Sequence, residues 1–568
     1  MANTTPLAAS RGERTALILV ALFVGLVCVL PVTRLALEAV APGGVPGLST
    51  AASVLSARST WTATGTTLLT ALGGTVIALL LGSAVALLVA LTDVRLKGAL
   101  VFAFLVPMMI PPQVAALAFA QMLGPASPLL NTLGIAPRLG APNPAYSLGG
   151  IVAVLGVQNA PLVFLALRAS LRALPRELVE AARSSGAGRW RVLRTVVLPL
   201  MTPALVAGGA ISFVSAAGNF GVPALLGIPA GLSTLSTLIY QRLAGFGPAV
   251  IAEVAVLSVV VAVLAACGFL VQRVALRGRD YRLAGAPSQA LAYPLGRWRL
   301  PIEIGAWSLV LLFVVAPLLA LLTTSLVASY GVPLNGTSAT LDNYREVLFR
   351  QDATIRAFRN SFLLAGVAAL MLLVVAVPLA VLAAQRPGKL LRALNGATDL
   401  PYALPGIVLA IAAILLFLRP LPVLGFSLYN TIWIIFIAYL ARFLALELRP
   451  LVAGALQMDA SLDEAARMSG AGFTRRLVTI ALPTLGPIAA AGAILVFMTA
   501  FNELTVSALL WSAGNETLGV AVFNLDDAGR STLAAALATS TVAVILAIML
   551  VTTLFGRRLP PGVLPWAR

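Results

Sequence analysis

The chain has 568 residues, of which 60% are hydrophobic and 10% are charged, and it contains no histidine. A soluble globular chain is nearer 45–50% apolar and about 25% charged, so this composition excludes that class. The net charge of +18 would suit a nucleic-acid-binding protein, but the basic residues lie in short segments between long apolar runs. That arrangement is typical of a membrane protein and argues against nucleic acid as a partner.

Apolar runs long enough to cross a bilayer as helices recur along the whole sequence. A spanning helix needs about 20 mostly apolar residues, and twelve segments meet this need. Their predicted starts lie near Thr15, Thr62, Ala99, Leu148, Met201, Ala249, Pro301, Ala357, Leu394, Tyr429, Leu485 and Thr532. We therefore predict an all-α polytopic membrane protein with about twelve transmembrane helices.

The first apolar run could also be a secretory signal peptide. Arg11 and Arg14 precede it, and Ala39-Val40-Ala41 resembles a cleavage site. The run from about Thr15 to Thr33 is longer than the roughly 7–15 residues of a signal-peptide core. We therefore expect an uncleaved first span.

The positions of lysine and arginine predict the orientation. If the N-terminus is cytoplasmic, most basic residues fall on the cytoplasmic side, as the positive-inside rule requires. The longest polar break contains Arg277, Arg279, Arg282, Arg297 and Arg299. We predict a cytoplasmic linker over residues 277–300, between a first half at 1–276 (core about 62–275) and a second at 301–568 (core about 357–555). Both termini are then cytoplasmic.

The sequence offers no residues for catalysis or metal binding. Cys28 and Cys267 lie in apolar runs far apart in the sequence, so neither a disulfide framework nor a Cys/His metal site is supported. The absence of histidine and of any clustered nucleophile argues against a membrane-embedded enzyme. We expect no catalytic residue, no metal ligand and no cofactor bound by this chain.

An internal repeat gives the strongest signal. Leu178–Pro203 and Leu462–Pro487 are identical at 15 of 26 aligned positions. Both copies fall in a predicted cytoplasmic loop, between the fourth and fifth spans of their half. A repeat of this kind predicts two halves of the same topology around a pseudo-two-fold axis normal to the membrane.

Two further features recur at nearly the same spacing. Pro107–Pro111 in the third span corresponds to Pro401–Pro405 in the ninth, and Asn219 after the fifth span corresponds to Glu503 after the eleventh. The repeat therefore covers whole six-span units.

The repeated loop has the pattern of a helix–turn–helix. Pro175 suits a helix start, and Gly186 and Gly188 should break that helix. A second amphipathic segment follows over about 189–197, and we expect Pro199 to end it and begin the next span. The second copy repeats this with Gly470, Gly472 and Pro483.

The loop's residue types favour a docking role. Ala181 and Ala182 are small enough for another protein to approach closely, while Glu180 and Arg183 can make charged contacts at the rim. A single copy could equally be an amphipathic helix lying on the bilayer. Two copies at matching positions favour docking.

At these residues the sequence resembles the permease subunits of ABC importers, whose loop has the form E-A-A-x3-G-x9-I-x-L-P. The second copy matches in full, while the first has Val196 where isoleucine is usual. The candidate coupling residues are Glu180, Ala181, Ala182, Arg183, Gly186, Gly188, Leu198, Pro199, Glu464, Ala465, Ala466, Arg467, Gly470, Gly472, Leu482 and Pro483.

The resemblance implies a mechanism and a set of partners. Each loop would be a coupling helix seated in a groove of a cytoplasmic ABC ATPase dimer. A periplasmic or lipid-anchored binding protein would deliver substrate, and the chain would lie in the bacterial inner membrane, surrounded by lipid. The chain itself lacks a phosphate-binding P-loop, in which serine or threonine follows the lysine. Its only two lysines, Lys97 and Lys389, are followed by Gly98 and Leu390. ATP is then used by the partner subunit.

The substrate is less sharply indicated. Two-repeat permeases of this size resemble the ferric-iron importer family most closely, and the stretch 501–523 is similar to that group. Thiamine, polyamine and aminoethylphosphonate permeases share the architecture. From another class, a secondary transporter with two parallel six-span halves is the alternative, although it has no need of paired coupling loops.

Polar residues close to spans are costly and often functional. On this ground Asn219, Asn502 and Glu503 are the candidates for the translocation pathway. It is equally open that they cap helix ends or face extracytoplasmic water. Glu253 and Glu447 also lie near spans, where their neighbours indicate no role.

Overall fold

The computed structural model describes residues 11–138, 140–245, 250–277, 293–386, 388–420 and 425–555. Over these ranges the chain is helical and contains no strand beyond two isolated bridges, Thr92 with Tyr293 and Val327 with Ala339. Most of the predicted linker, residues 278–292, lies outside the described ranges, as do residues 1–10 and 556–568.

The helices of the first half follow the predicted order of spans. Their bounds are α1 (Arg11–Val24), η1 (Gly25–Val29), α2 (Leu30–Val40), α3 (Ser49–Ser56), α4 (Arg58–Leu91), α5 (Lys97–Met109), α6 (Pro112–Leu123), α7 (Pro128–Thr132), α8 (Leu148–Arg172), α9 (Arg176–Ser184), α10 (Arg189–Val192), η3 (Leu193–Val197), α11 (Leu198–Ala217), η4 (Pro223–Gly227), α12 (Leu235–Leu243) and α13 (Val250–Ala275).

The second half repeats this series. Its helices are η5 (Gly296–Trp298), α14 (Arg299–Val310), η6 (Leu311–Val315), α15 (Ala316–Ser325), α16 (Asp342–Arg345), η7 (Glu346–Arg350), α17 (Asp352–Gln385), α18 (Lys389–Ala403), α19 (Gly406–Phe417), α20 (Ile432–Ala455), α21 (Ala460–Met468), α22 (Phe473–Arg476), η8 (Leu477–Ala481), α23 (Leu482–Phe501), α24 (Ser507–Leu510), α25 (Leu518–Asp527) and α26 (Ser531–Phe555).

Ten helical segments of the described chain are long and apolar enough to cross a membrane. An eleventh is the pair α18 and α19, which bends by 108° between its two helices. The predicted tenth span corresponds to α20, which is 24 residues long but contains Arg442, Glu447 and Arg449. The predicted third span is broken into α5 and α6. The fold class is thus confirmed, with two of the twelve predicted spans broken and one unusually charged.

Glycine allows the closest helix pair of the first half to form. A Cβ atom on Gly82 of α4 would lie 2.6 Å from the Ala160 carbonyl oxygen of α8, and one on Gly156 of α8 would lie 2.5 Å from Ile77. Small residues let membrane helices approach closely where lipid provides no hydrophobic drive. The corresponding pair in the second half, α17 with α20, also packs together, and α17 has buried alanines such as Ala365 and Ala368.

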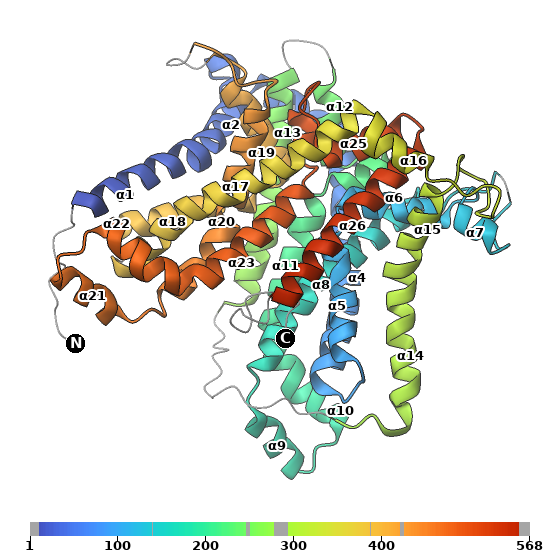
Figure 1. The fold of residues 1–568 in the computed structure, drawn as a ribbon, viewed down its shortest axis with the longest axis horizontal. Helices are drawn as coiled ribbons and strands as arrows, with labels where there is room; N and C mark the ends of the chain where they lie inside the picture. The colour runs from blue at the N-terminus through green and yellow to red at the C-terminus, as the bar shows by residue number, and fades with distance from the viewer. Residues whose placement is uncertain are drawn as a thin grey trace.

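The first span of each half packs against the other half. Helices α1, η1 and α2 contact α17, α18, α19 and α20, while α14, η6 and α15 contact α5, α6 and α7. Figure 1 shows α1 in blue beside α17 and α18, and α14 beside α5. The two halves are therefore interlocked through their first spans.

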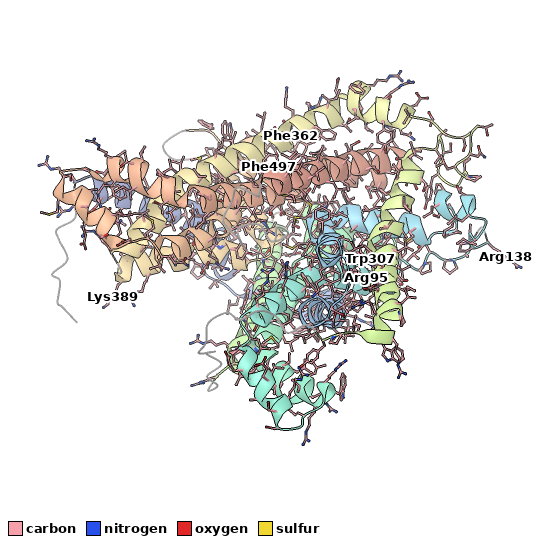
Figure 2. The ribbon with its side chains drawn as sticks, turned by 60° about the horizontal axis from the view of Figure 1, so that its bottom comes forward. Arg95, Arg138, Trp307, Phe362, Lys389 and Phe497 are labelled. Carbon is pink, nitrogen blue, oxygen red and sulfur yellow. The ribbon has the colours of Figure 1, made fainter. Side chains whose placement is uncertain are left out.

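The two halves diverge from a common region. In Figure 1, α12 and α25 lie where the halves meet, and α9 and α21 lie at the far ends of two separate arms. Figure 2 shows the same divergence after a 60° rotation, with Lys389 near the end of one arm. The same view shows Phe362 of α17 near Phe497 of α23, whose ring centroids are 6.0 Å apart.

Candidate functional site

The two repeated loops adopt the same backbone conformation. Helix α9 ends at Ser184, and Gly186 follows with φ +80°, a left-handed conformation that glycine adopts without strain. In the second copy α21 ends at Met468, and Gly470 has φ +76°. Each turn is followed by a glycine N-cap, Gly188 or Gly472, with φ −66° in both. The predicted helix–turn–helix therefore forms twice.

The loop residues that the sequence singled out lie largely on the surface. Fully exposed are Glu180, Ala181, Arg183, Glu464 and Ala465, while Ala182, Ala466 and Arg467 are half-buried. Trp190 in the first loop and Met468 in the second are large apolar side chains that are 69% and 89% exposed.

The expectation that Pro199 ends the second loop segment is wrong. One helical segment runs without interruption from Arg189 to Ala217, and its counterpart runs from Phe473 to Phe501. Five-residue π-helical turns, η3 and η8, precede Leu198 and Leu482, the residues just before Pro199 and Pro483. In a π turn the hydrogen bonds skip one more residue, and Leu198 N–H donates to the Leu193 carbonyl. The wider turn accommodates the missing proline N–H, so the second segment of each loop and the following span form one continuous helix.

The two proline pairs mark breaks with the same geometry. Ile110 has φ −79° and ψ 133° and is followed by Pro111 with φ −54° and ψ 138°. Leu404 has φ −79° and ψ 140°, followed by Pro405 with φ −54° and ψ 141°. Both breaks turn the chain sharply and leave backbone carbonyl groups without helical partners.

The break in each half meets the end of a helix from the other half. Asn502, just after α23, donates from Nδ2 to the Met109 carbonyl at 2.9 Å. Gly218, which corresponds to Asn502 in the repeat, lies so close to the second break that a Cβ atom there would be 2.9 Å from Pro405 Cβ. The two contacts occupy corresponding positions in the two halves. Asn502 thus joins the halves, and its place in the pathway stays a prediction.

Asn219 and Glu503 each cap the turn that follows their helix. Asn219 Oδ1 accepts from the Val222 N–H at 3.0 Å, and Glu503 Oε1 accepts from the Val506 N–H at 2.9 Å. Both side chains therefore bond the backbone of the following turn, while their place in the pathway stays a prediction. Glu503 also forms an ion pair with Arg442, 3.3 Å away.

Arg442 is a residue that the sequence interpretation missed. In the repeat alignment Arg442 of α20 corresponds to Gln158 of α8, whose Nε2 donates to the Ile110 carbonyl at 3.4 Å. Gly406 at the second break leaves room for the guanidinium, because a Cβ atom there would be 2.5 Å from Arg442 Nη1. The second half therefore has the ion pair of Arg442 with Glu503, whereas the first half has the side-chain amides of Gln158 and Asn219 at the corresponding positions. The signal available was an arginine in the middle of a predicted span.

Glu447 is fully buried between α20 and α23, and neither of its carboxylate oxygens has a hydrogen-bond partner among the described residues. It faces Gly492, where a Cβ atom would be 2.6 Å from Oε2. The corresponding pair in the first half is Val163 with Gly208. The sequence indicated no role for Glu447. The structure adds that Gly492 leaves room for its carboxylate, and it assigns the residue no role.

The first spans are held by ion pairs of opposite polarity. Arg299 of α14 pairs with Asp93 just after α4. Glu13 of α1, in the first half, pairs with Arg386 just after α17, in the second half, at 2.8 Å. The Leu295 N–H also donates to Asp93 at 2.9 Å. This hydrogen bond, with help from Arg299, lowers the pKa of the Asp93 carboxyl below its usual value.

Comparison with known proteins identifies this architecture. The family described as "Binding-protein-dependent transport system inner membrane component" matches residues 74–277 and again 376–564. The chain belongs to this family. It is an ABC importer permease carrying two copies of the permease unit, and this membership favours an importer over the secondary-transporter alternative.

Individual relatives agree with the family. A probable ABC transporter permease of Sinorhizobium fredii is 29% identical over 414 residues, which cover 71% of this chain and 70% of that protein. The ferric transport system permease protein FbpB of Actinobacillus pleuropneumoniae is 25% identical over 399 residues, covering 69% of this chain and 56% of that protein. The permease thus spans little more than half of this ferric relative.

A solved bacterial ABC transporter, involved in import of the acidic polysaccharide alginate, is 18% identical with a TM-score of 0.39. The likeness covers 46% of this chain and 97% of that one.

Proposed function

We propose that this permease forms the whole membrane pathway of an importer for ferric iron, driven by ATP hydrolysis in a separate ATPase dimer. The observation that carries the coupling role is the pair of exposed helices α9 and α21, each joined by a glycine turn to a second helix that runs through a π turn into a span. Such a helix transmits a push on the loop to the membrane segment. In this proposal the loops transmit force, and this chain performs no chemistry on ATP.

The choice of iron rests on the ferric relatives. Besides the A. pleuropneumoniae protein, a putative ferric transport permease of Haemophilus influenzae is 26% identical over 366 residues, which cover 63% of this chain and 55% of that protein. A binding protein would hold the metal outside the membrane and deliver it between the halves. Thiamine, polyamines and aminoethylphosphonate are the substrates to test next.

The proposal also assigns the sides of the membrane. The loops α9 and α21 and both termini would be cytoplasmic, facing the ATPase. The region around α12 and α25, where the halves meet in Figure 1, would face the binding protein. The divergence of the halves toward α9 and α21 suits an inward-facing state.

Uptake of radiolabelled ferric citrate tests the substrate and the coupling role together. Cells lacking the permease would be compared with cells carrying it, and with cells carrying Gly186→Pro plus Gly470→Pro. Proline fixes φ near −65°, so it cannot adopt the +80° and +76° of these glycines. We expect the normal chain to restore uptake and the double variant to fail while still reaching the membrane.

A matched control separates loss of coupling from general strain. Gly134 also has a positive φ, +70°, in open space, and its N–H donates to the carbonyl three residues earlier, as those of Gly186 and Gly470 do. Gly134→Pro should leave uptake close to normal, because it lies in another loop, after α7. No difference in iron uptake between cells with and without the permease would refute iron as the substrate.

A further inference from the structure

The two coupling loops are anchored by different chemistry. In α9, Val179 is 1% exposed and packs in the apolar core with Val192, which is also 1% exposed. At the corresponding positions the second loop has Asp463 and Arg476, which form an ion pair. Helix α21 itself contains no buried residue. Two buried valines therefore hold the first loop, whereas an ion pair occupies their positions in the second loop, beside the buried Phe473 of α22.

These charged contacts converge on a residue from the opposite end of the chain. Glu13 of α1, whose side chain is 3% exposed, lies 2.5 Å from Arg476 Nη2 and 3.2 Å from Arg467 Nη2. Arg467 belongs to the second coupling motif and also pairs with Asp463 at 2.7 Å. With Arg386, three guanidinium groups and two carboxylates share one largely buried cluster. Buried charges of this kind are stable only when all are paired.

We propose that Glu13 is a positioning residue for transport, which holds the second coupling loop to the N-terminal helix so that α1 moves with α21. This inference rests on the proposed coupling function. Removing the Glu13 charge leaves Arg467 and Arg476 to share the carboxylate of Asp463, and the repulsion between the two guanidinium groups loosens α21 from α1. The first loop has no such dependence, because valines occupy the positions of Asp463 and Arg476.

The primary variant is Glu13→Gln, which keeps the side-chain shape and removes the charge. Its matched control is Glu38→Gln, which removes another buried carboxylate from the same helical segment, Arg11–Val40. Glu38 pairs with Arg34 at 2.8 Å and accepts from the Gly43 N–H, away from either loop. We expect substrate uptake by Glu13→Gln to fall about tenfold at an unchanged amount of membrane-inserted chain, and Glu38→Gln to transport normally.

A disulfide can replace the proposed contact. A Cβ atom on Gly12 would lie 3.3 Å from Phe473 Cβ, which is near the Cβ separation of natural disulfides. Gly12→Cys plus Phe473→Cys, with Cys28 and Cys267 replaced by alanine, therefore links α1 to the helix that follows the second loop. Membrane vesicles loaded with ATP would be oxidised with diamide and then reduced with dithiothreitol, with uptake measured in each state.

The expected result is conditional rescue. In the Glu13→Gln background the oxidised cysteine pair should restore uptake of ferric citrate, and reduction should abolish it again. With Glu13 present, uptake should be insensitive to the state of the disulfide. The rate of disulfide formation should also fall about threefold in Glu13→Gln, because α21 is held less closely.

Four outcomes separate the possible failures. Normal uptake and normal disulfide formation in Glu13→Gln would overturn the proposal, and so would slower disulfide formation with unchanged uptake. Loss of uptake that the disulfide does not restore would show that Glu13 serves only folding, which also overturns it. If the normal permease takes up neither iron nor the alternative substrates, the importer proposal itself fails, and the rate of disulfide formation still measures the contact.

Discussion

The close approach of α4 and α8 makes Gly82→Ala a sharp test of the packing in the first half. The new methyl group would lie 2.6 Å from the Ala160 carbonyl oxygen, 2.8 Å from Val163 Cβ and 3.0 Å from the Phe164 nitrogen. Two of these atoms belong to backbone, which cannot rotate away. The helices must therefore separate, and overpacking of this kind costs about 1–3 kcal/mol.

Gly65→Ala on the same helix is the matched control. Nothing lies within 4 Å of a Cβ atom at Gly65, so alanine should be neutral there, or stabilising by about 0.5–1 kcal/mol through its higher helix propensity. The assay is thermal unfolding of the detergent-solubilised permease, followed by the loss of its monodisperse chromatographic peak. We expect Gly82→Ala to melt at a lower temperature than the native chain, and Gly65→Ala at the same temperature or higher. Equal melting of the two variants would refute the packing argument.

Three further predictions concern contacts at and between the halves. Glu503→Gln should destabilise the permease by about 2–4 kcal/mol because it leaves Arg442 unpaired. The double variant Arg442→Gln plus Glu503→Asn, which introduces the residue types of Gln158 and Asn219, should recover part of that loss in the same melting assay. Asn502→Ala should cost about 1 kcal/mol of stability by removing the hydrogen bond to Met109, and it should lower uptake. Asn515→Ala, in a loop after α24, should leave uptake unchanged. Equal uptake by the two variants would contradict a role for Asn502 at the contact between the halves. Asp93→Arg and Arg299→Asp should each lower the amount of folded chain recovered from membranes, and the double exchange should restore it; failure of the double exchange would show that the Leu295 hydrogen bond, rather than charge, holds this contact.

The sequence predicts the class, the order of spans and both helix–turn–helix loops, because each depends on local patterns. Hydrophobic length sets the spans, and Gly186 and Gly470 set the turns. The repeat also relates the two proline breaks correctly. The continuous helix through Pro199 could not be foreseen, since a π turn depends on how a whole span packs and not on the proline alone.

The contacts between the halves lay beyond the sequence patterns for a different reason. Glu13 and Arg476 are far apart in the chain, and nothing local indicates that the first span crosses to the other half. Arg442 was visible as a charge inside a span, but its partner Glu503 was assigned to the pathway on its own. Long-range pairing of this kind is decided by tertiary packing, which local periodicity does not encode.

The opposite polarity of the two ion pairs at the first spans has a consequence for how the duplicated halves tell themselves apart. If α1 folded back onto its own half, Glu13 would face Asp93, and if α14 did the same, Arg299 would face Arg386. Both arrangements place like charges together. Only the crossed arrangement satisfies all four residues, so two copies of the same half would also mismatch. The inverted charges therefore favour contact between the two unlike halves, and we expect halves made as separate chains to pair with each other rather than with copies of themselves.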